Sequence, residues 1–310
     1  MFGFGESSFT VGDIPNLSGK VILVTGGNSG LGAESVLQLA KHNPSQIYLA
    51  ARTEAKANTA IATIKEKVPN ASITYLELDL TSFASIKKAA DQVSQGAGRL
   101  DILLNNAGIM ATPSGMTKDG YEIQFGTNHM GHALLTRLLL PTLQKTAKEQ
   151  GPDADVRIVN LSSAAHQWAP TGGLLLEQCK TDMQSTNTWA RYGQSKLANI
   201  LYTKALATRF PEIKCVTVHP GSVNTGLRRG PAESYPYLKL PIGYLTRFVT
   251  VGVAHGALTQ LFAATSKDAK TGTYYVPTAK EDPGNEYARD QKLVDRLWEY
   301  TQKELDAAGY

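Results

Sequence analysis

The sequence predicts an α/β fold in which one doubly wound parallel sheet carries helices on both faces. Short apolar runs rich in β-branched residues alternate with longer amphipathic stretches along the chain. No linker, internal repeat or low-complexity segment interrupts this alternation. Alternation of this kind builds right-handed βαβ units around a parallel sheet. We therefore expect a single domain of the Rossmann type over residues 1–310.

The first two elements set the pattern for the rest. Residues 20–25 read KVILVT, a short β-branched run typical of a buried strand, and the run ends at Gly26. A helix is expected from Gly30, because Ala33, Val36 and Ala40 recur on one helical face. This order of strand, glycine turn and helix opens a βαβ unit.

The same two patterns continue to the end of the chain. Short apolar runs predict strands, and apolar residues spaced three or four apart predict helices. In order, we expect a strand over 46–51, a helix over 54–68, a strand over 72–78, a helix over 82–94, a strand over 100–105, a long helix within 120–148, a strand over 156–161, a helix over 191–210, a strand over 214–219, a short strand over 272–276 and an amphipathic helix over about 290–305.

The composition limits the class of protein. With 42% apolar and 19% charged residues the chain is an ordinary globular protein, which excludes disorder. A net charge of +4 with scattered cations predicts no nucleic-acid partner, and Cys179 and Cys215 are too few for a disulfide framework. His129 and His132 lack a third ligand, so no metal is expected. Without a signal-peptide pattern or a membrane-span pattern, we expect a cytoplasmic protein.

A glycine-rich turn follows the first strand, where residues 26–32 read GGNSGLG. Glycines allow a tight turn, let the backbone approach a pyrophosphate closely and let the helix pack near the strand. The amino terminus of the helix then offers free amides to the anion. The turn therefore indicates a site for a dinucleotide.

Further segments, in order along the chain, make the sequence resemble the short-chain dehydrogenase/reductase family. Asn-Asn-Ala-Gly at 105–108 ends the fourth strand, Ser163 follows the fifth, and His-Pro-Gly at 219–221 closes the sixth. Tyr192 and Lys196 form the Tyr-x-x-x-Lys pattern, and Asn128 lies in the helix that follows the fourth strand. The resemblance spans residues 25–225 and implies an oxidoreductase that uses a nicotinamide dinucleotide.

The candidate catalytic residues are Asn128, Ser163, Tyr192 and Lys196. Tyr192 and Lys196 are four apart, so both side chains lie on one helical face. An ammonium beside a phenol favours the phenolate, so Lys196 is expected to make Tyr192 a usable acid or base. Ser163 can hold the substrate carbonyl oxygen. We prefer it to Ser162 because the family's serine stands three residues after the strand Asn. By the same resemblance, Asn128 holds a water that relays protons.

The end of the second strand predicts NADP(H) as the cofactor. No acid stands there, and Arg52 offers a planar fork of donors for a phosphate, although Glu54 two residues later argues for NAD. The resemblance adds contacts from Asp79 near the adenine and from Lys196 to the ribose hydroxyls. The candidate cofactor-binding residues are Gly26, Asn28, Ser29, Gly30, Leu31, Gly32, Arg52, Asp79, Leu80, Asn106, Ala107, Gly108, Tyr192, Lys196, Pro220, Gly221, Val223 and Thr225.

The expected substrate is a small-molecule carbonyl or alcohol. Residues 128–132, 161–166 and 297–301 resemble the retinol-dehydrogenase-like branch, many of whose animal members carry an amino-terminal anchor that is not seen here. A substrate lid is expected near 222–245, where glycines and prolines break regular structure and tyrosines and leucines favour a bulky apolar substrate. Trp168 and Trp189 line the substrate cleft or pack in the core.

The sequence allows a second function and leaves the oligomeric state open. The main alternative to an enzyme is a non-redox dinucleotide-binding protein on the same fold, acting as a sensor, as a scaffold or in a cyclisation. Such relatives often lose the catalytic Tyr or Lys, and both are present here. A homo-oligomer is also left open.

Overall fold

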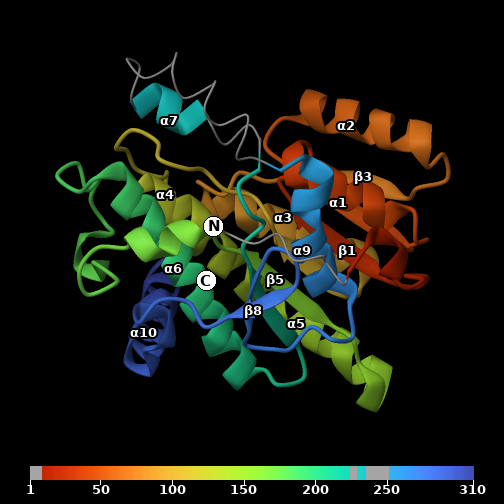
Figure 1. The fold of residues 1–310 in the computed structure, drawn as a ribbon. Helices are drawn as coiled ribbons and strands as arrows, with labels where there is room; N and C mark the ends of the chain where they lie inside the picture. The colour runs from red at the N-terminus through yellow and green to blue at the C-terminus, as the bar shows by residue number, and fades with distance from the viewer. Residues whose placement is uncertain (1–8, 224–228, 235–250) are drawn as a thin grey trace.

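A single eight-stranded sheet organises the protein in the computed structural model, which describes residues 9–223, 229–234 and 251–310 (Figure 1). The strand order is β3-β2-β1-β4-β5-β6-β7-β8. Strands β1 to β7 pair in parallel and β8 pairs antiparallel to β7. The strands are β1 (Val21–Thr25), β2 (Gln46–Ala51), β3 (Ile73–Glu77), β4 (Ile102–Asn105), β5 (Arg157–Leu161), β6 (Lys214–Val218), β7 (Tyr274–Val276) and β8 (Lys280–Asp282).

Helices cover both faces of this sheet (Figure 1). One face carries α3 (Phe83–Ala97), α4 (Ile123–Phe125), α5 (Gly131–Gln150), α6 (Thr188–Arg209) and α10 (Gln291–Ala307). The other face carries α1 (Gly30–Ala40), α2 (Glu54–Lys67) and α9 (Val253–Thr265). Because both faces are covered, the five residues of β1 are all buried.

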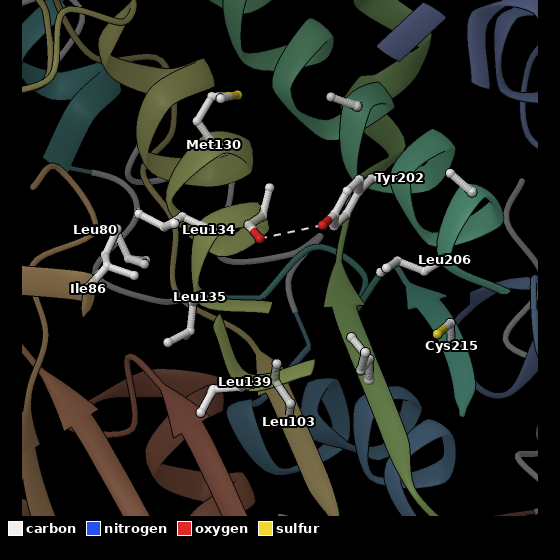
Figure 2. Close-up of a cluster of buried hydrophobic side chains, with 14 of the residues drawn as sticks. Leu80, Ile86, Leu103, Met130, Leu134, Leu135, Leu139, Tyr202, Leu206 and Cys215 are labelled. Carbon is white, nitrogen blue, oxygen red and sulfur yellow. Dashed lines mark hydrogen bonds between the residues drawn. The ribbon is translucent and has the colours of Figure 1, made fainter. Parts of the chain in front are cut away.

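The two cores form on opposite sides of the strands. Val21 and Leu23 of β1 face one core, whereas Ile22 and Val24 face the other. In the core under α5, leucines of that helix lie close to Leu103 of β4 (Figure 2). Tyr202 of α6 reaches the same region and donates a hydrogen bond of 3.4 Å to the carbonyl of Ala133 (Figure 2). Helices α5 and α6 are thereby fixed side by side.

The predicted alternation of strands and helices is confirmed, with element ends that differ by a few residues. Besides the short 3-10 helices, three elements were not predicted, and one of them is helix α7 (Arg229–Ser234), which lies where glycines and prolines were expected to break regular structure. Helix α9 is apolar on nearly all sides and packs against α1 and the sheet, so it shows little helical periodicity. Strand β8 reads Lys-Glu-Asp and pairs antiparallel at the sheet edge. Its polar residues do not predict a strand. It forms a strand because β7 offers an edge with which it can pair.

The long helix expected within 120–148 is not uniform. It consists of α4, one π-helical turn over Gly126–Met130 and α5. Such turns are rare and occur often at functional sites. Asn128 lies at the middle of the turn and is fully buried.

The order of strands places a binding edge. Connections run one way from β1 to β3 and the other way from β4 to β6, so the order reverses between β1 and β4. Ligands of open parallel sheets bind at the carboxyl ends of the strands next to such a reversal. In the part of the chain that the structure describes, no helix is long and apolar enough to cross a bilayer.

Candidate active site

The turn after β1 has a backbone that requires glycine. Gly26 and Gly30 have φ angles of +66° and +52°, in the left-handed region that favours glycine. A side chain on Gly32 would collide with the carbonyl oxygen of Gly26. Helix α1 begins at Gly30, and the amides of its first turn have no partners within the helix. This turn therefore fits the pyrophosphate of a dinucleotide.

The loop after β4 is attached to the same turn. The side-chain amide of Asn106 donates to the carbonyl of Thr25 at 2.7 Å, and the backbone amide of Ala107 donates to the Thr25 hydroxyl at 2.9 Å. That hydroxyl also lies 3.0 Å from Nε2 of His132. The structure thus brings two predicted cofactor segments together. Sequence analysis did not single out Thr25, although a polar residue ending an apolar strand is a signal that could have identified it.

Asn128 holds the loop after β4 against α6. Its side-chain oxygen accepts from the amide of Ile109 at 2.9 Å, and its side-chain nitrogen donates to the Ile109 carbonyl at 2.9 Å. The same nitrogen lies 2.9 Å from the hydroxyl of Ser195, which donates to the carbonyl of Tyr192 at 2.7 Å. A methyl group on Gly108 would lie 3.1 Å from the Asn128 oxygen. The proposed water relay through Asn128 stays a prediction.

Tyr192 and Lys196 meet on one face of α6, as their spacing predicts. Nζ of Lys196 lies 5.7 Å from the centre of the Tyr192 ring and donates to the carbonyl of Leu161 at 3.1 Å. Leu161 ends β5, so this contact places Lys196 at the carboxyl edge of the sheet. Both side chains are buried. The same nitrogen lies near Gly108, at 3.4 Å from the position of an added methyl group.

Burial controls how these two groups ionise. It lowers the pKa of Lys196 to about 8, because an ammonium without water is costly. It raises the pKa of Tyr192 to about 12, and the hydrogen bond with Ser163 opposes this only in part. The Tyr192 pKa thus moves opposite to the direction expected from Lys196 alone. The reason is that the buried phenolate would lose its hydration.

Ser163 stands directly after β5, at the start of the 3-10 helix η4 (Ala164–Trp168). Its hydroxyl accepts from the amide of Ala165 at 3.2 Å and interacts with the phenol of Tyr192. The neighbouring Ser162 is buried and donates to the carbonyl of Lys196 at 2.7 Å. This arrangement favours Ser163 over Ser162 as the residue available to a substrate.

His166 fixes the backbone of Ser163. Its Nδ1 lies 2.8 Å from the Ser163 carbonyl, and the backbone amide of Asn285 donates to its Nε2 at 3.3 Å. Since a backbone amide can only donate, Nε2 is the acceptor and Nδ1 carries the proton. Burial lowers the pKa of His166, in keeping with this neutral ring. No local sequence pattern links His166 to Asn285, because the two residues lie 119 positions apart.

The predicted residues at the adenosine end lie on two neighbouring strand ends. Arg52 follows β2, is exposed and makes no hydrogen bond or ion pair with the residues that the structure describes. Burial raises the pKa of Asp79, but hydrogen bonds from Thr81 and Lys118 outweigh it and the net pKa is lowered. The buried Leu80 packs against α5. Arg52 therefore carries a guanidinium without protein partners at this end of the described site.

The segment after β6 continues the same edge. The backbone amide of His219 donates to Tyr275 of β7 at 2.8 Å, and burial lowers the His219 pKa to about 4. Pro220 and Gly221 follow, and Gly221 has a φ of +87°. Val223 pairs with Val251. Thr225 and most of the lid expected near 222–245 lie outside the described residues.

One part of that expected lid is described. Helix α7 (Arg229–Ser234) lies against the loop after β4. The hydroxyl of Ser234 donates to the carbonyl of Ala111 at 2.7 Å, and Gly230 leaves no room for a side chain beside the Met110 carbonyl. Ala111 itself has a left-handed φ of +47°. This helix is thus attached to the loop that begins at Asn106.

Known proteins resemble this chain along its whole length. The family model for short chain dehydrogenases matches residues 20–173. An uncharacterized oxidoreductase of Schizosaccharomyces pombe is 40% identical, over 99% of this chain and 91% of that protein. The short-chain dehydrogenase TIC 32 B of Brassica napus, named as chloroplastic, is 36% identical over 98% of this chain and 95% of that protein.

A solved structure supports the same fold. An uncharacterized protein from Mycobacterium paratuberculosis superposes with a TM-score of 0.72 at 29% identity, covering 96% of this chain and 97% of that chain. The α/β fold predicted from the sequence is therefore confirmed. The retinol-dehydrogenase-like branch and the cytoplasmic location stay predictions.

Proposed function

The chain belongs to the short-chain dehydrogenase/reductase family and is a nicotinamide-dependent oxidoreductase, and from this premise we propose its reaction and its catalytic residues. The reaction is hydride transfer between NADP(H) and the carbonyl or alcohol of a bulky apolar small molecule. Tyr192 is the acid and base. The observation that carries this proposal is the convergence of Ser163, Tyr192 and Lys196 beside Gly108, which lies close to Asn128 of the π-helical turn.

Each residue has a chemical task that fits its surroundings. When bound, the nicotinamide supplies or accepts the hydride. The phenol of Tyr192, with a pKa of about 12, is protonated at neutral pH and can donate its proton to the carbonyl oxygen. Ser163 stabilises the negative charge that develops on that oxygen. Lys196 holds the ribose of the cofactor and places a positive charge near the phenol when protonated.

Asn128 has a positioning task in this proposal. Its side-chain amide forms hydrogen bonds with Ile109 in the loop and with Ser195. Ser195 in turn donates a hydrogen bond to the backbone carbonyl of Tyr192. The loop that carries Asn106 to Gly108 is thus kept at a constant distance from the reacting phenol. The cofactor site and the acid are therefore held in a fixed relative position before the substrate binds.

Turnover tests the proposed acid. Wild-type protein is screened against ketones and aldehydes for NADPH consumption, and Tyr192→Phe is compared with it. The variant is expected to bind NADPH as the wild type does and to lose turnover by roughly 10²- to 10⁴-fold, the range for a positioned acid. Unchanged turnover would contradict the role of Tyr192. Tight NADPH binding without turnover of any carbonyl would favour a sensor, a scaffold or a cyclisation-assisting protein.

Arg52 tests the choice of cofactor. It is exposed, free of protein partners in the described part of the chain and placed at the end of β2. Arg52→Ala is expected to weaken NADPH binding by about 1.5 to 3 kcal/mol, the range for hydrogen bonds to charged groups, and to leave NADH binding unchanged. Lys56→Ala, an exposed cation of α2, is the matched control. A wild type that prefers NADH would show that Arg52 does not select the cofactor.

A further inference from the structure

Two tryptophans meet beside the candidate active site. Trp168 ends η4, which begins directly after Ser163, and Trp189 lies in the first turn of α6, which carries Tyr192. Their ring centres are 5.5 Å apart and their planes are at 89°. Trp168 is 56% exposed, the most exposed large apolar side chain of the described residues. Trp189 is half-buried. An exposed indole pair of this kind is suited to binding a ligand.

The position of Trp189 on α6 relates the pair to the reacting groups. Trp189, Tyr192 and Lys196 are spaced three and four residues apart, so they form one row along the helix. Lys196 marks the inner end of the row, because it contacts Leu161 at the edge of the sheet. Trp189 marks the outer end. A substrate whose carbonyl lies at Tyr192 can therefore extend along the row to Trp189.

The backbone that carries Trp168 packs directly against helix α6. A side chain on Gly193 would lie 2.6 Å from the carbonyl oxygen of Ala165 and 2.7 Å from the carbonyl carbon of Trp168, so the backbones of η4 and α6 are in direct contact. Asn187 caps α6 by accepting from the amide of Trp189 at 2.8 Å. Both indoles thus stand on backbone that these contacts fix, which lowers the cost of ordering them around a ligand.

The perpendicular planes form a corner. A flat ring stacked on one indole turns its edge toward the face of the other, and both are preferred aromatic geometries. A saturated ring of the same size is not flat and can make only one of these contacts well. Trp189 lies three residues before Tyr192 on α6, so the Cβ atoms of the two residues are about 5–6 Å apart.

We infer that Trp168 and Trp189 form the substrate-side wall of the site and select carbonyl compounds that carry a flat aromatic or conjugated ring close to the reacting carbon. The inference rests on the proposed function and names its substrate class. It assigns the exposed indoles to a small ligand, with a membrane surface or a protein partner as the competing occupants.

Paired substrates test the ring preference. Acetophenone and cyclohexyl methyl ketone have the same skeleton size and differ in the flatness of the ring. The wild type is expected to have the lower KM for acetophenone. Replacing both indoles, Trp168→Leu with Trp189→Leu, is expected to raise that KM roughly 2- to 10-fold, because an aromatic pair contributes about 0.5–1.5 kcal/mol beyond its buried area. The KM for the cyclohexyl ketone is expected to rise less, because its ring makes only one of the two contacts well, so the ratio of the two KM values moves toward one. Equal KM values for the two ketones in the wild type would overturn the inference.

A binding measurement separates this inference from the proposed reaction. The chain has three tryptophans, and Trp298 stacks on Tyr202 in α6 at 5.7 Å, so Trp298→Phe leaves fluorescence from the pair alone. In that variant with Tyr192→Phe and NADP present, acetophenone is expected to quench the indole emission at lower concentration than the cyclohexyl ketone. This result would support the wall even if no ketone were reduced. Indole emission that responds only to lipid vesicles, or to neither ketone, would overturn it.

Discussion

At the level of single residues, burial decides the charge of the reacting groups. Lys196 has an ordinary lysine pKa of 10.5 that burial lowers to about 8, so the folded protein binds this proton less tightly than the unfolded chain does. Tyr192 is affected in the opposite sense, since burial raises its pKa to about 12. Both groups are shifted toward their neutral forms. A phenol that stays protonated at neutral pH can donate its proton to a carbonyl oxygen, whereas burial disfavours the phenolate that would accept a proton from an alcohol.

The Lys196 shift predicts a pH dependence of stability. Between about pH 8 and the ordinary lysine value of 10.5 the unfolded state binds more protons at this residue, so the free energy of unfolding rises with pH in this window. Relative to Lys196→Met, the wild type is expected to gain about 2 kcal/mol between pH 8 and pH 10. Urea denaturation of both proteins at several pH values measures this difference. A difference that is constant with pH would show that Lys196 is not desolvated.

At the level of elements, the contact between η4 and α6 sets the distance from Ser163 to Tyr192. The two segments are in contact at Gly193, where the backbone of η4 occupies the space that a side chain would need. His166 fixes the other side of η4 through Asn285, in the turn between β8 and α10. Ser163 is therefore held from two directions. The backbone that carries its hydroxyl is therefore fixed beside α6.

Gly193→Ala tests this contact. The added methyl group would push η4 away from α6, since it would lie 2.6 Å from the Ala165 oxygen. We expect a loss of about 1–3 kcal/mol in unfolding free energy and a decrease of roughly 10- to 100-fold in kcat, the effect of misplacing a reacting group by about 1 Å. Gly115→Ala is the control, because nothing lies within 4 Å of the added group. A variant with the kcat of the wild type would show that η4 can shift without consequence.

At the level of the whole molecule, the two edges of the sheet have different tasks. The carboxyl edge carries the glycine turn, Ser163 and Lys196, which are the groups of the proposed reaction. The amino edge carries satisfied polar networks. There the buried Arg157 donates to the carbonyls of Ala263 and Ser266 at the end of α9, at 3.1 and 2.8 Å. The amino edge therefore stabilises the fold and leaves the chemistry to the opposite edge.

Asp101 tests this division. Its buried carboxylate accepts from the amide of Val21 at 2.8 Å and from Arg99 at 2.7 and 3.0 Å. Asp101→Ala is expected to cost about 1–3 kcal/mol of unfolding free energy, since the Val21 amide is left unpaired, with kcat unchanged. Asp91→Ala removes an exposed pair with Lys87 and is expected to cost less than about 1 kcal/mol. Loss of turnover in Asp101→Ala at full folding would contradict the separation of the two edges.

Local patterns in the sequence were enough to predict most of the fold. The strands of the parallel sheet and all the longer helices except α9 follow from apolar spacing within about ten residues. The glycine turn and the shared face of Tyr192 and Lys196 also follow from local spacing, because each lies within two turns of helix or one loop. These features depend on neighbours along the chain, which the sequence displays directly.

Only the tertiary structure decided the rest. The contact of His166 with Asn285 joins residues 119 positions apart, and no local pattern encodes such a pair. The antiparallel β8 exists because β7 offers it an edge, and α9 shows no amphipathic pattern because it is buried on most sides. A lowered pKa of Tyr192 was expected from its neighbour Lys196, yet burial raises that pKa and only the hydrogen bond with Ser163 opposes it. Burial depends on how distant segments pack, so it is decided by the fold and not by sequence spacing.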